Sequence, residues 1–179
     1  LRAMLGKDVE MKNLIVTVLF VGVFSNLSYA DSNMIQWSGN GHWYQVVNNQ
    51  EPLSWVEAQS QAELLGGYLA TLTSVKEDQW VFDSIVNNED FWNSRSGPHI
   101  GAFQNLESAD YYEPNGGWEW VTGEPWGYSN WQVDQPDNDN GDEHFAHFKS
   151  KGEGPPLDQW NDLEITTLIP PIAFIVEYD

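Results

Sequence analysis

The sequence predicts an α+β domain with two helices beside mostly antiparallel sheets. Short apolar stretches at 41–47, 145–148 and 172–178 are typical of strands. Two helix-start signatures lie between the first and second of these stretches, at Ser54 and Ser74. The order of strand, two helices, irregular region and further strands is typical of domains whose helices lie on an antiparallel sheet.

Residues 1–30 carry the pattern of a signal peptide. Met11-Lys12-Asn13 leads into an apolar run at 14–24, and Ser28-Tyr29-Ala30 ends in the small residue that a signal peptidase accepts. The run suits a secretory segment and is too short to span a bilayer. Because the chain opens on Leu1, we expect an upstream extension before a start at Met4 or Met11. An uncleaved anchor is the alternative interpretation.

Cleavage near Asp31 would leave 31–40 as an N-terminal lead-in and 41–179 as one domain with a single core. We expect this mature protein to be secreted or periplasmic, without membrane insertion. The formal net charge of the chain is −20, which repels phosphate backbones and anionic lipids and so excludes nucleic acid as a partner. The acid excess fits cation binding, while solubility or adaptation to salt is the alternative for most of these carboxylates.

The two helices are bounded by local signals. Ser54 and Glu57 form a capping box, which is followed by apolar residues at helical spacing and ended by Gly66-Gly67: Trp55, Ala58, Ala62 and Leu65. Ser74 and Glu77 form a second capping box, and Asn87-Asn88 ends that helix. The chain has no cysteine, so its loops must be closed by packing, to which its 10 Trp contribute.

The region at 104–142 has no regular pattern and is rich in Gly, Pro, Asn and Trp. Irregular segments of this length inside a compact domain are uncommon and usually functional. We interpret Trp118, Trp120 and Trp131 in this region as core residues, with an aromatic sugar platform as the alternative.

Oxygen-bearing side chains are concentrated at the end of this region and beyond it. The segments concerned are Gln135-Pro136-Asp137, Glu143 and Trp160-Asn161-Asp162. Crowded carboxylates raise each other's pKa unless a cation lies between them. Ca²⁺ takes about six to eight oxygen ligands from carboxylates, amides and water, and an X–Pro bond can lock a sharp turn. The sequence therefore predicts one Ca²⁺ site, with the metal ligands Gln135, Asp137, Glu143, Asn161 and Asp162.

The motifs, taken in order, resemble the C-type lectin-like domain over 41–178. They are Gly66-Gly67-Tyr68-Leu69-Ala70-Thr71-Leu72 with Glu77, Ile100-Gly101 after His99, Gly117-Trp118-Glu119-Trp120 with Gly123, Ser129-Asn130-Trp131 before Gln135-Pro136-Asp137, Trp160-Asn161-Asp162, and Phe174-Ile175-Val176-Glu177. Each motif is weak alone, but their shared order and spacing are specific. The resemblance implies the C-type lectin-like fold with a long irregular ligand-binding loop.

The chain departs from this family in its cysteines. The family usually carries two disulfides, whose positions fall here on Ala62 with Val176 and on Phe145 with Ile165. All four residues are apolar, so we expect packing to replace each cross-link.

In the sugar-binding members, one Ca²⁺ is held by residues matching Gln135, Asp137, Glu143, Asn161 and Asp162, and the same groups bind two neighbouring sugar hydroxyls. Carboxylates accept from a hydroxyl, whereas amides donate to it. In the family, Gln-Pro-Asp goes with galactose-type sugars and Glu-Pro-Asn with mannose-type sugars. The resemblance implies a calcium-dependent lectin for galactose or related glycans that binds a vicinal diol, with Trp160 as a further ligand contact.

Some site features of the family are missing here. No aromatic residue directly follows the Gln-Pro-Asp motif to stack on a sugar; Trp131, Trp160 and His144 are candidates for that role. A second family Ca²⁺ position would fall near Gln104, Asn138 and His144, none of which is a carboxylate. We therefore expect a single Ca²⁺.

Other functional interpretations have less support. No Ser-His-Asp spacing, P-loop or dinucleotide motif is present, so we expect no enzyme, and a glycoside-processing carboxylate pair is the least supported alternative. An EF-hand at 137–141 is rejected, since its glycine is at the wrong offset. His144 and His147 should face opposite sides of a strand. A protein- or ice-binding module without sugar activity is the remaining alternative. Nothing in the sequence resembles a stalk that would form an oligomer.

Overall fold

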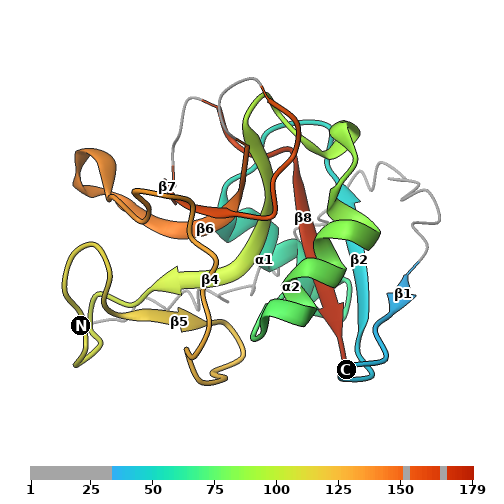
Figure 1. Cartoon of the computed structure of the whole chain (residues 1–179), viewed down its shortest axis with the longest axis horizontal. Coiled ribbons are helices and arrows are strands. Elements are labelled where there is room, and N and C mark those ends of the chain that lie inside the picture. The colour runs from blue at the N-terminus through green and yellow to red at the C-terminus, as the bar shows by residue number, and fades with distance from the viewer. Residues whose placement is uncertain (1–33, 151–153, 166–168) are drawn as a thin grey trace, which may run out of the picture.

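The computed structural model describes residues 34–150, 154–165 and 169–179 and has an α+β architecture (Figure 1). The signal peptide expected at 1–30 lies outside the described residues. The strands are β1 (Ile35–Gln36), β2 (Trp43–Asn48), β3 (Tyr68–Leu69), β4 (Ser96–Gln104), β5 (Trp118–Trp120), β6 (Glu143–Lys149), β7 (Trp160–Glu164) and β8 (Ala173–Tyr178). The helices are α1 (Trp55–Leu64) and α2 (Val75–Val81), with shorter helical turns at Phe82–Val86, Glu89–Phe91 and Asp139–Gly141.

The strands form one sheet in the order β1-β2-β8-β4-β6-β7, with β3 paired to β8 and β5 to β4. Most pairs are antiparallel, as the sequence predicts; β4 and β8 meet in parallel at His99 and Phe174. Strand β2 runs along the whole of β8, from the pair Trp43–Tyr178 to the pair Asn48–Ala173. This ladder joins the beginning and end of the domain without a covalent link.

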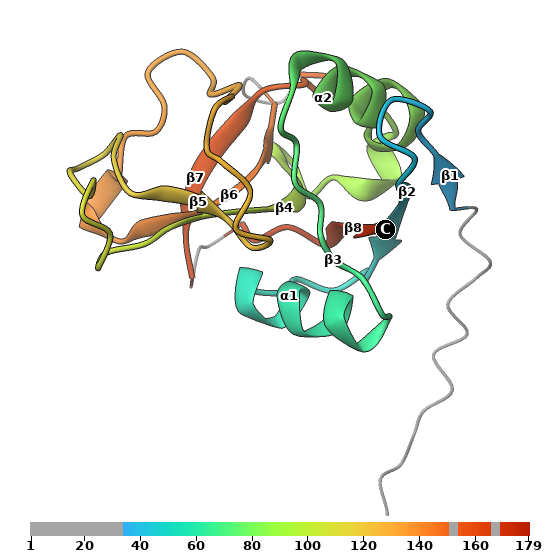
Figure 2. The ribbon, with the colours of Figure 1, turned by 90° about the horizontal axis from the view of Figure 1, so that it is seen from below.

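Helix α1 begins and ends where the sequence predicts. Ser54 Oγ accepts from Glu57 N at 3.3 Å, and Glu57 Oε2 accepts from Ser54 N at 2.8 Å, which completes the capping box. After the helix, Gly66 takes the left-handed backbone (φ +87°) that favours glycine. Figure 2 shows α1 and α2 on opposite sides of β2 and β8, so each face of this part of the sheet is covered.

Helix α2 keeps only half of its expected capping box. Ser74 accepts from Glu77 N, but the Glu77 carboxylate turns into the protein and is 2% exposed. There it accepts from Thr73 N at 2.8 Å and from the Tyr44 hydroxyl at 2.6 Å. The prediction of a second complete capping box was therefore wrong, because buried donors hold this carboxylate away from Ser74. The helix passes into a π-helical turn and ends at Asn87, as expected.

Packing replaces one of the two family disulfides as expected. Ala62 and Val176 are both fully buried in the core cluster under α1. The expectation for the second pair was wrong: Ile165 is 43% exposed, whereas Phe145 lies opposite Leu163 in the ladder and stacks on Trp55 at 4.9 Å. The reason is register, since Ile165 falls just beyond the end of β7.

Aromatic packing orders the long loop between β5 and β6. The indole rings of Trp118 and Trp131 lie 4.6 Å apart, and those of Trp120 and Trp126 lie 4.8 Å apart. Trp118 and Trp120 are buried core residues, as expected, and Trp131 packs against that core while partly exposed. The loop is thus held in place because its tryptophans pack on the core, where aromatic side chains bury a large apolar surface area.

Within the described residues, no helix has the length and apolar character needed to cross a membrane.

Candidate functional site

Three carboxylates from separate segments converge beside the sheet. Asp137 comes from the long loop, Glu143 from the start of β6 and Asp162 from β7. One carboxylate oxygen from each residue lies within 4.8 Å of the corresponding oxygens of the other two. Ca²⁺ binds oxygen at roughly 2.3–2.6 Å, so oxygens on opposite sides of one ion are about 5 Å apart. The spacing of the three carboxylates therefore fits a single cation of this kind.

Backbone amides attach the long loop to β7 at this point. Asp162 accepts from Asp137 N at 3.2 Å and from Asn138 N at 2.7 Å. Glu143 accepts from Asp139 N at 3.0 Å, and its own amide donates to Asn138 Oδ1 at 2.9 Å. The bond between Gln135 and Pro136 is cis. The hydrogen bonds from the amides of the loop to Asp162 on β7 and to Glu143 at the start of β6 therefore fix where the carboxylates lie.

The base of the long loop is tied to α2 by one buried acid. Asp78 accepts from the Tyr128 hydroxyl at 2.7 Å, from Asn130 Nδ2 at 2.8 Å and from the Trp160 indole at 3.2 Å. Burial raises the pKa of Asp78 to about 7, while these three hydrogen bonds oppose the rise. Asp78 thus joins helix α2, the long loop and β7, a role that no sequence signal indicated.

The carboxylate cluster runs from the surface into the protein. Asp137 is exposed, Glu143 is half-buried and Asp162 is 0% exposed. Burial raises the pKa of Glu143 to about 8, with the charge of Asp162 as the next cause. Burial also raises the pKa of Asp162, although the amides of Asn138 and Asp137 oppose the change. Negative charge here is costly unless a cation balances it.

The two predicted amide ligands have unusual surroundings. Gln135 Oε1 is buried and has no hydrogen-bond partner among the described residues. Asn161 is 3% exposed; its Nδ2 contacts His147 Nε2 at 3.4 Å and donates to the Asp162 carbonyl. Asn161 Oδ1 accepts from the Lys149 ammonium. A buried acceptor without a donor and an all-oxygen donor set both fit a hard cation such as Ca²⁺.

The structure places Trp160 in the core rather than at the ligand site. It is 0% exposed and packs edge-on against Trp120 at 5.7 Å between ring centres. Its indole has no surface to offer a sugar, so the prediction that Trp160 contacts the ligand is not supported. The residue before the Asn-Asp pair instead faces the tryptophans beneath the loop, because side chains alternate along a strand.

The two histidines of β6 differ as predicted. His147 is buried and lies opposite Asn161 in the ladder, whereas His144 is partly exposed and its Nδ1 lies 2.9 Å from Gln104 Oε1. Burial holds the pKa of His147 well below its usual value, so this ring is neutral near pH 7. Lys149 and Asn138 were not predicted as site residues; only the pairing of β6 with β7 reveals the position of Lys149.

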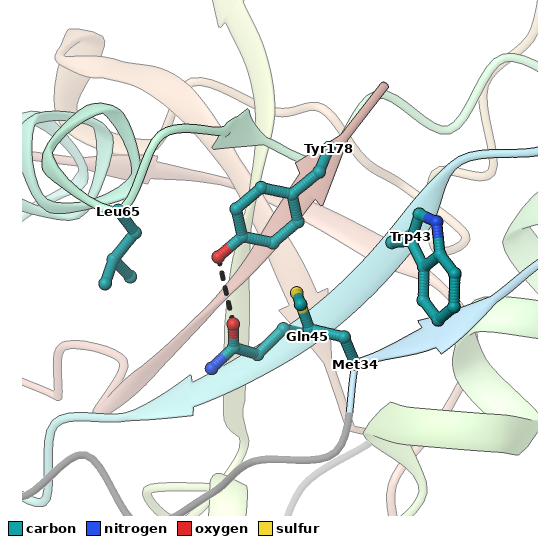
Figure 3. Close-up of a pocket in the computed structure, with 5 residues that line it drawn as sticks. All are labelled: Met34, Trp43, Gln45, Leu65 and Tyr178. Atoms are coloured by element: carbon teal, nitrogen blue, oxygen red, sulfur yellow. Dashed lines mark hydrogen bonds between the residues drawn. The ribbon is translucent and has the colours of Figure 1, made fainter.

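An apolar pocket lies away from the carboxylates, between β1, β2, β8 and the end of α1 (Figure 3). Its lining residues are Met34, Trp43, Gln45, Leu65 and Tyr178. The Tyr178 hydroxyl donates a hydrogen bond to Gln45 Oε1 at 2.9 Å across the pocket. These lining residues carry no carboxylate, so the chemistry of the pocket is distinct from that of the cluster.

No family model matches the chain. A perlucin-like protein of Mytilus galloprovincialis is 32% identical over 115 residues, which are 64% of this chain and 64% of that protein. Asialoglycoprotein receptor 1 of Mus musculus is 27% identical over 150 residues, which are 80% of this chain and 43% of the receptor. The matches thus span less than two thirds of the length of these curated relatives.

Solved structures share the fold. The C-type carbohydrate-recognition domain of cow CD23, crystallised with an oligosaccharide, has a TM-score of 0.57 at 20% identity and matches 76% of this chain and 87% of that one. A calcium-independent type II antifreeze protein has a TM-score of 0.56 at 18% identity over 76% of this chain and 85% of its own. The chain therefore has the C-type lectin-like fold, and the relatives support a C-type lectin-like domain.

Proposed function

We propose that the protein is a calcium-dependent carbohydrate-binding lectin that binds a vicinal diol through a single Ca²⁺. The ligands assigned to the ion are Gln135, Asp137, Glu143, Asn161 and Asp162. The observation that carries the proposal is the convergence of Asp137, Glu143 and Asp162 within 4.8 Å of one another from three separate segments. Such a group is stable in ionised form when a divalent cation supplies the missing positive charge.

The mixed acid and amide character of the site suits hydroxyl recognition. Bound Ca²⁺ would take a lone pair from each of two neighbouring hydroxyls. The carboxylates would accept hydrogen bonds from the hydroxyl groups, and Gln135 Nε2 would donate to a hydroxyl oxygen, because Asn161 Nδ2 already donates to the Asp162 carbonyl. Asp137 is the exposed member of the cluster and is assigned to ligand contact, whereas Asp162 lies at its buried end.

We assign the specificity to galactose or related glycans. The order Gln135-Pro136-Asp137 places the amide before the proline and the acid after it. Similarity to a receptor named for asialoglycoproteins supports a glycan ligand. Trp131, which is partly exposed, remains a candidate for stacking on the apolar face of the sugar.

The proposal describes a binding protein rather than an enzyme, exported by the apolar segment at 14–24. One diol contacts little surface, so binding by a single site is expected to be weak. Several linked copies would raise the apparent affinity by increasing the effective concentration of sites.

The test is retention on immobilised galactose with Ca²⁺ and with EDTA, using the wild type, Asp162→Asn and Glu143→Gln. We expect the column to retain the wild type in Ca²⁺ but not in EDTA. We expect neither variant to be retained in either condition. Asp142→Asn is the matched control, because it removes the same charge from an exposed neighbour and should be retained. Retention of Asp162→Asn equal to that of the wild type would refute the assignment.

Recognition of protein or ice without sugar is the second candidate. A calcium-independent antifreeze protein shares the fold, so the fold alone does not decide between the two functions. A glycan array probed in Ca²⁺ and in EDTA separates them. The absence of any EDTA-sensitive glycan would favour the second candidate.

A further inference from the structure

A lysine ammonium contacts one of the amide ligands proposed for Ca²⁺. Lys149 ends β6, and its ammonium donates to Asn161 Oδ1. Asn161 belongs to β7 and is assigned to the Ca²⁺ ligands above. The oxygen proposed to face the metal ion is thus already in contact with a positive charge.

The orientation of the Asn161 amide is fixed from its other side. Its Nδ2 donates to the Asp162 carbonyl and lies 3.4 Å from His147 Nε2. The amide therefore directs its oxygen, and not its nitrogen, toward Lys149. This same orientation is the one that a metal ligand needs.

Electrostatics place the ammonium in the field of all three carboxylates. Burial and the charge of Arg95 lower the pKa of Lys149, whereas the charges of Glu143, Asp137 and Asp162 raise it. The ammonium is half-buried, unlike the exposed side chain of Lys76 on α2. Lys149 is thus held in the site by its hydrogen bond to Asn161 rather than directed into solvent.

We propose that Lys149 is a tethered competitor of Ca²⁺ that occupies Asn161 Oδ1 and sets a low calcium affinity for the site. This inference rests on the proposed function. A divalent ion and an ammonium on one oxygen repel each other strongly at such short range, so the metal must displace Lys149 when it binds. The flexible four-carbon stem of lysine allows the ammonium to swing into water. The chain would then bind sugar only where calcium is abundant.

The experiment is calorimetric titration of chelator-stripped protein with CaCl₂, using the wild type, Lys149→Met, Lys149→Arg and Lys76→Met. We expect Lys149→Met, which keeps the length but loses the charge, to bind Ca²⁺ about tenfold more tightly, equivalent to about 1.4 kcal/mol. Lys149→Arg keeps the charge and should bind like the wild type. Lys76→Met makes the same charge change on an exposed helix face and should also bind like the wild type, because salt screens distant surface charges.

The results separate this inference from the lectin proposal. Calcium affinity of Lys149→Met equal to or below that of a wild type that retains sugar would overturn the competition alone. Tighter calcium binding by Lys149→Met in a protein that retains no galactose would overturn the lectin proposal and leave the competition standing. If neither protein took up calcium, both would be overturned.

A second measurement uses the unaltered protein and so does not depend on the folding of a variant. Acetylation of lysines, followed by mass spectrometry, is compared in EDTA and in Ca²⁺. Displacement predicts that labelling of Lys149 rises when Ca²⁺ is added, while labelling of Lys76 is unchanged. Unchanged or reduced labelling of Lys149 would overturn the inference.

Discussion

Two groups of acids in the described part of the protein are stabilised in different ways. The interior group, Glu77 and Glu177, lies between α2 and the β2–β8 ladder. Glu177 accepts from Thr71 N at 2.8 Å, its Oε1 lies 2.6 Å from His42 Nδ1, and the Tyr44 hydroxyl oxygen lies 2.9 Å from the same Oε1. Glu77 accepts from Thr73 N and from the Tyr44 hydroxyl. Every carboxylate oxygen of the interior group thus has a protein donor.

The carboxylate cluster of Asp137, Glu143 and Asp162 differs in its donors. Backbone amides reach Asp162 and one oxygen of Glu143. Elsewhere in the cluster the carboxyl groups face one another: burial raises the pKa of Glu143 most, followed by the charge of Asp162 and then by the charge and hydrogen bonding of Asp137. Burial of acids alone therefore does not indicate a ligand site. A shortage of donors does, because charge without a partner is costly in the protein interior.

The largest expected effect comes from breaking the interior group. Tyr44 is fully buried, and its hydroxyl lies within hydrogen-bond distance of both Glu77 and Glu177. Hydrogen bonds to charged groups contribute about 1.5–3 kcal/mol each. We expect Tyr44→Phe to lower the free energy of unfolding by about 3 kcal/mol, by the same amount in EDTA and in Ca²⁺, as measured by urea denaturation.

Tyr68→Phe is the matched control for this prediction. The Tyr68 hydroxyl donates to Asp179 at 2.7 Å at the protein surface, so its loss should change the free energy of unfolding by less than about 0.5 kcal/mol. If the loss of stability in Tyr44→Phe depended on calcium, the separation of the two groups would be wrong.

The cluster should give the stability of the protein an unusual pH dependence. The pKa of Glu143 is raised from 4.5 to about 8 by burial and by the nearby charge of Asp162. Between these values the folded state binds a proton that the unfolded chain has lost, so stability in EDTA falls as the pH rises from about 4.5 to about 8. Below this window both states are protonated, and above it both are ionised.

Glu143→Gln should reduce this slope, because a glutamine side chain does not titrate, while the other buried acids with raised pKa values, Asp78, Asp162 and Glu177, keep their share. Calcium favours the ionised carboxylates, so it should also flatten the slope in the wild type. Thermal melting at several pH values, in EDTA and in Ca²⁺, measures both effects. Equal slopes for the variant and the wild type in EDTA would show that the Glu143 carboxyl is ionised throughout.

Local sequence patterns predicted those parts of the fold that local interactions determine. The capping box at Ser54 and Glu57 formed because its partners are three residues apart. Glu77 has the same spacing from Ser74, yet its carboxylate is held by Tyr44, which is distant in sequence. A local pattern cannot show which donor a carboxylate will bind when a buried donor from a distant part of the chain is also within reach.

The candidate site was predictable as a set of residues but not as a geometry. Asp137, Glu143 and Asp162 came from motifs, and the structure brings them together. The approach of Lys149 to Asn161 and the exposure of Ile165 both follow from the register of β6 and β7, which no motif specifies. The burial of Trp160 follows from which face of β7 meets the tryptophans of the loop.

Swapping the amide and the acid on either side of Pro136 should have the smallest effect on stability and the largest effect on sugar specificity. Gln135→Glu with Asp137→Asn leaves the net charge unchanged but reverses donor and acceptor across the proposed diol site. In Ca²⁺ we expect stability within about 0.5 kcal/mol of the wild type and a shift of preference from galactose to mannose in competition binding. In EDTA the variant should be less stable than the wild type, because the new carboxylate replaces a buried amide oxygen that has no hydrogen-bond partner among the described residues. Unchanged sugar preference would show that the loop around the site, rather than the order of acid and amide, selects the glycan.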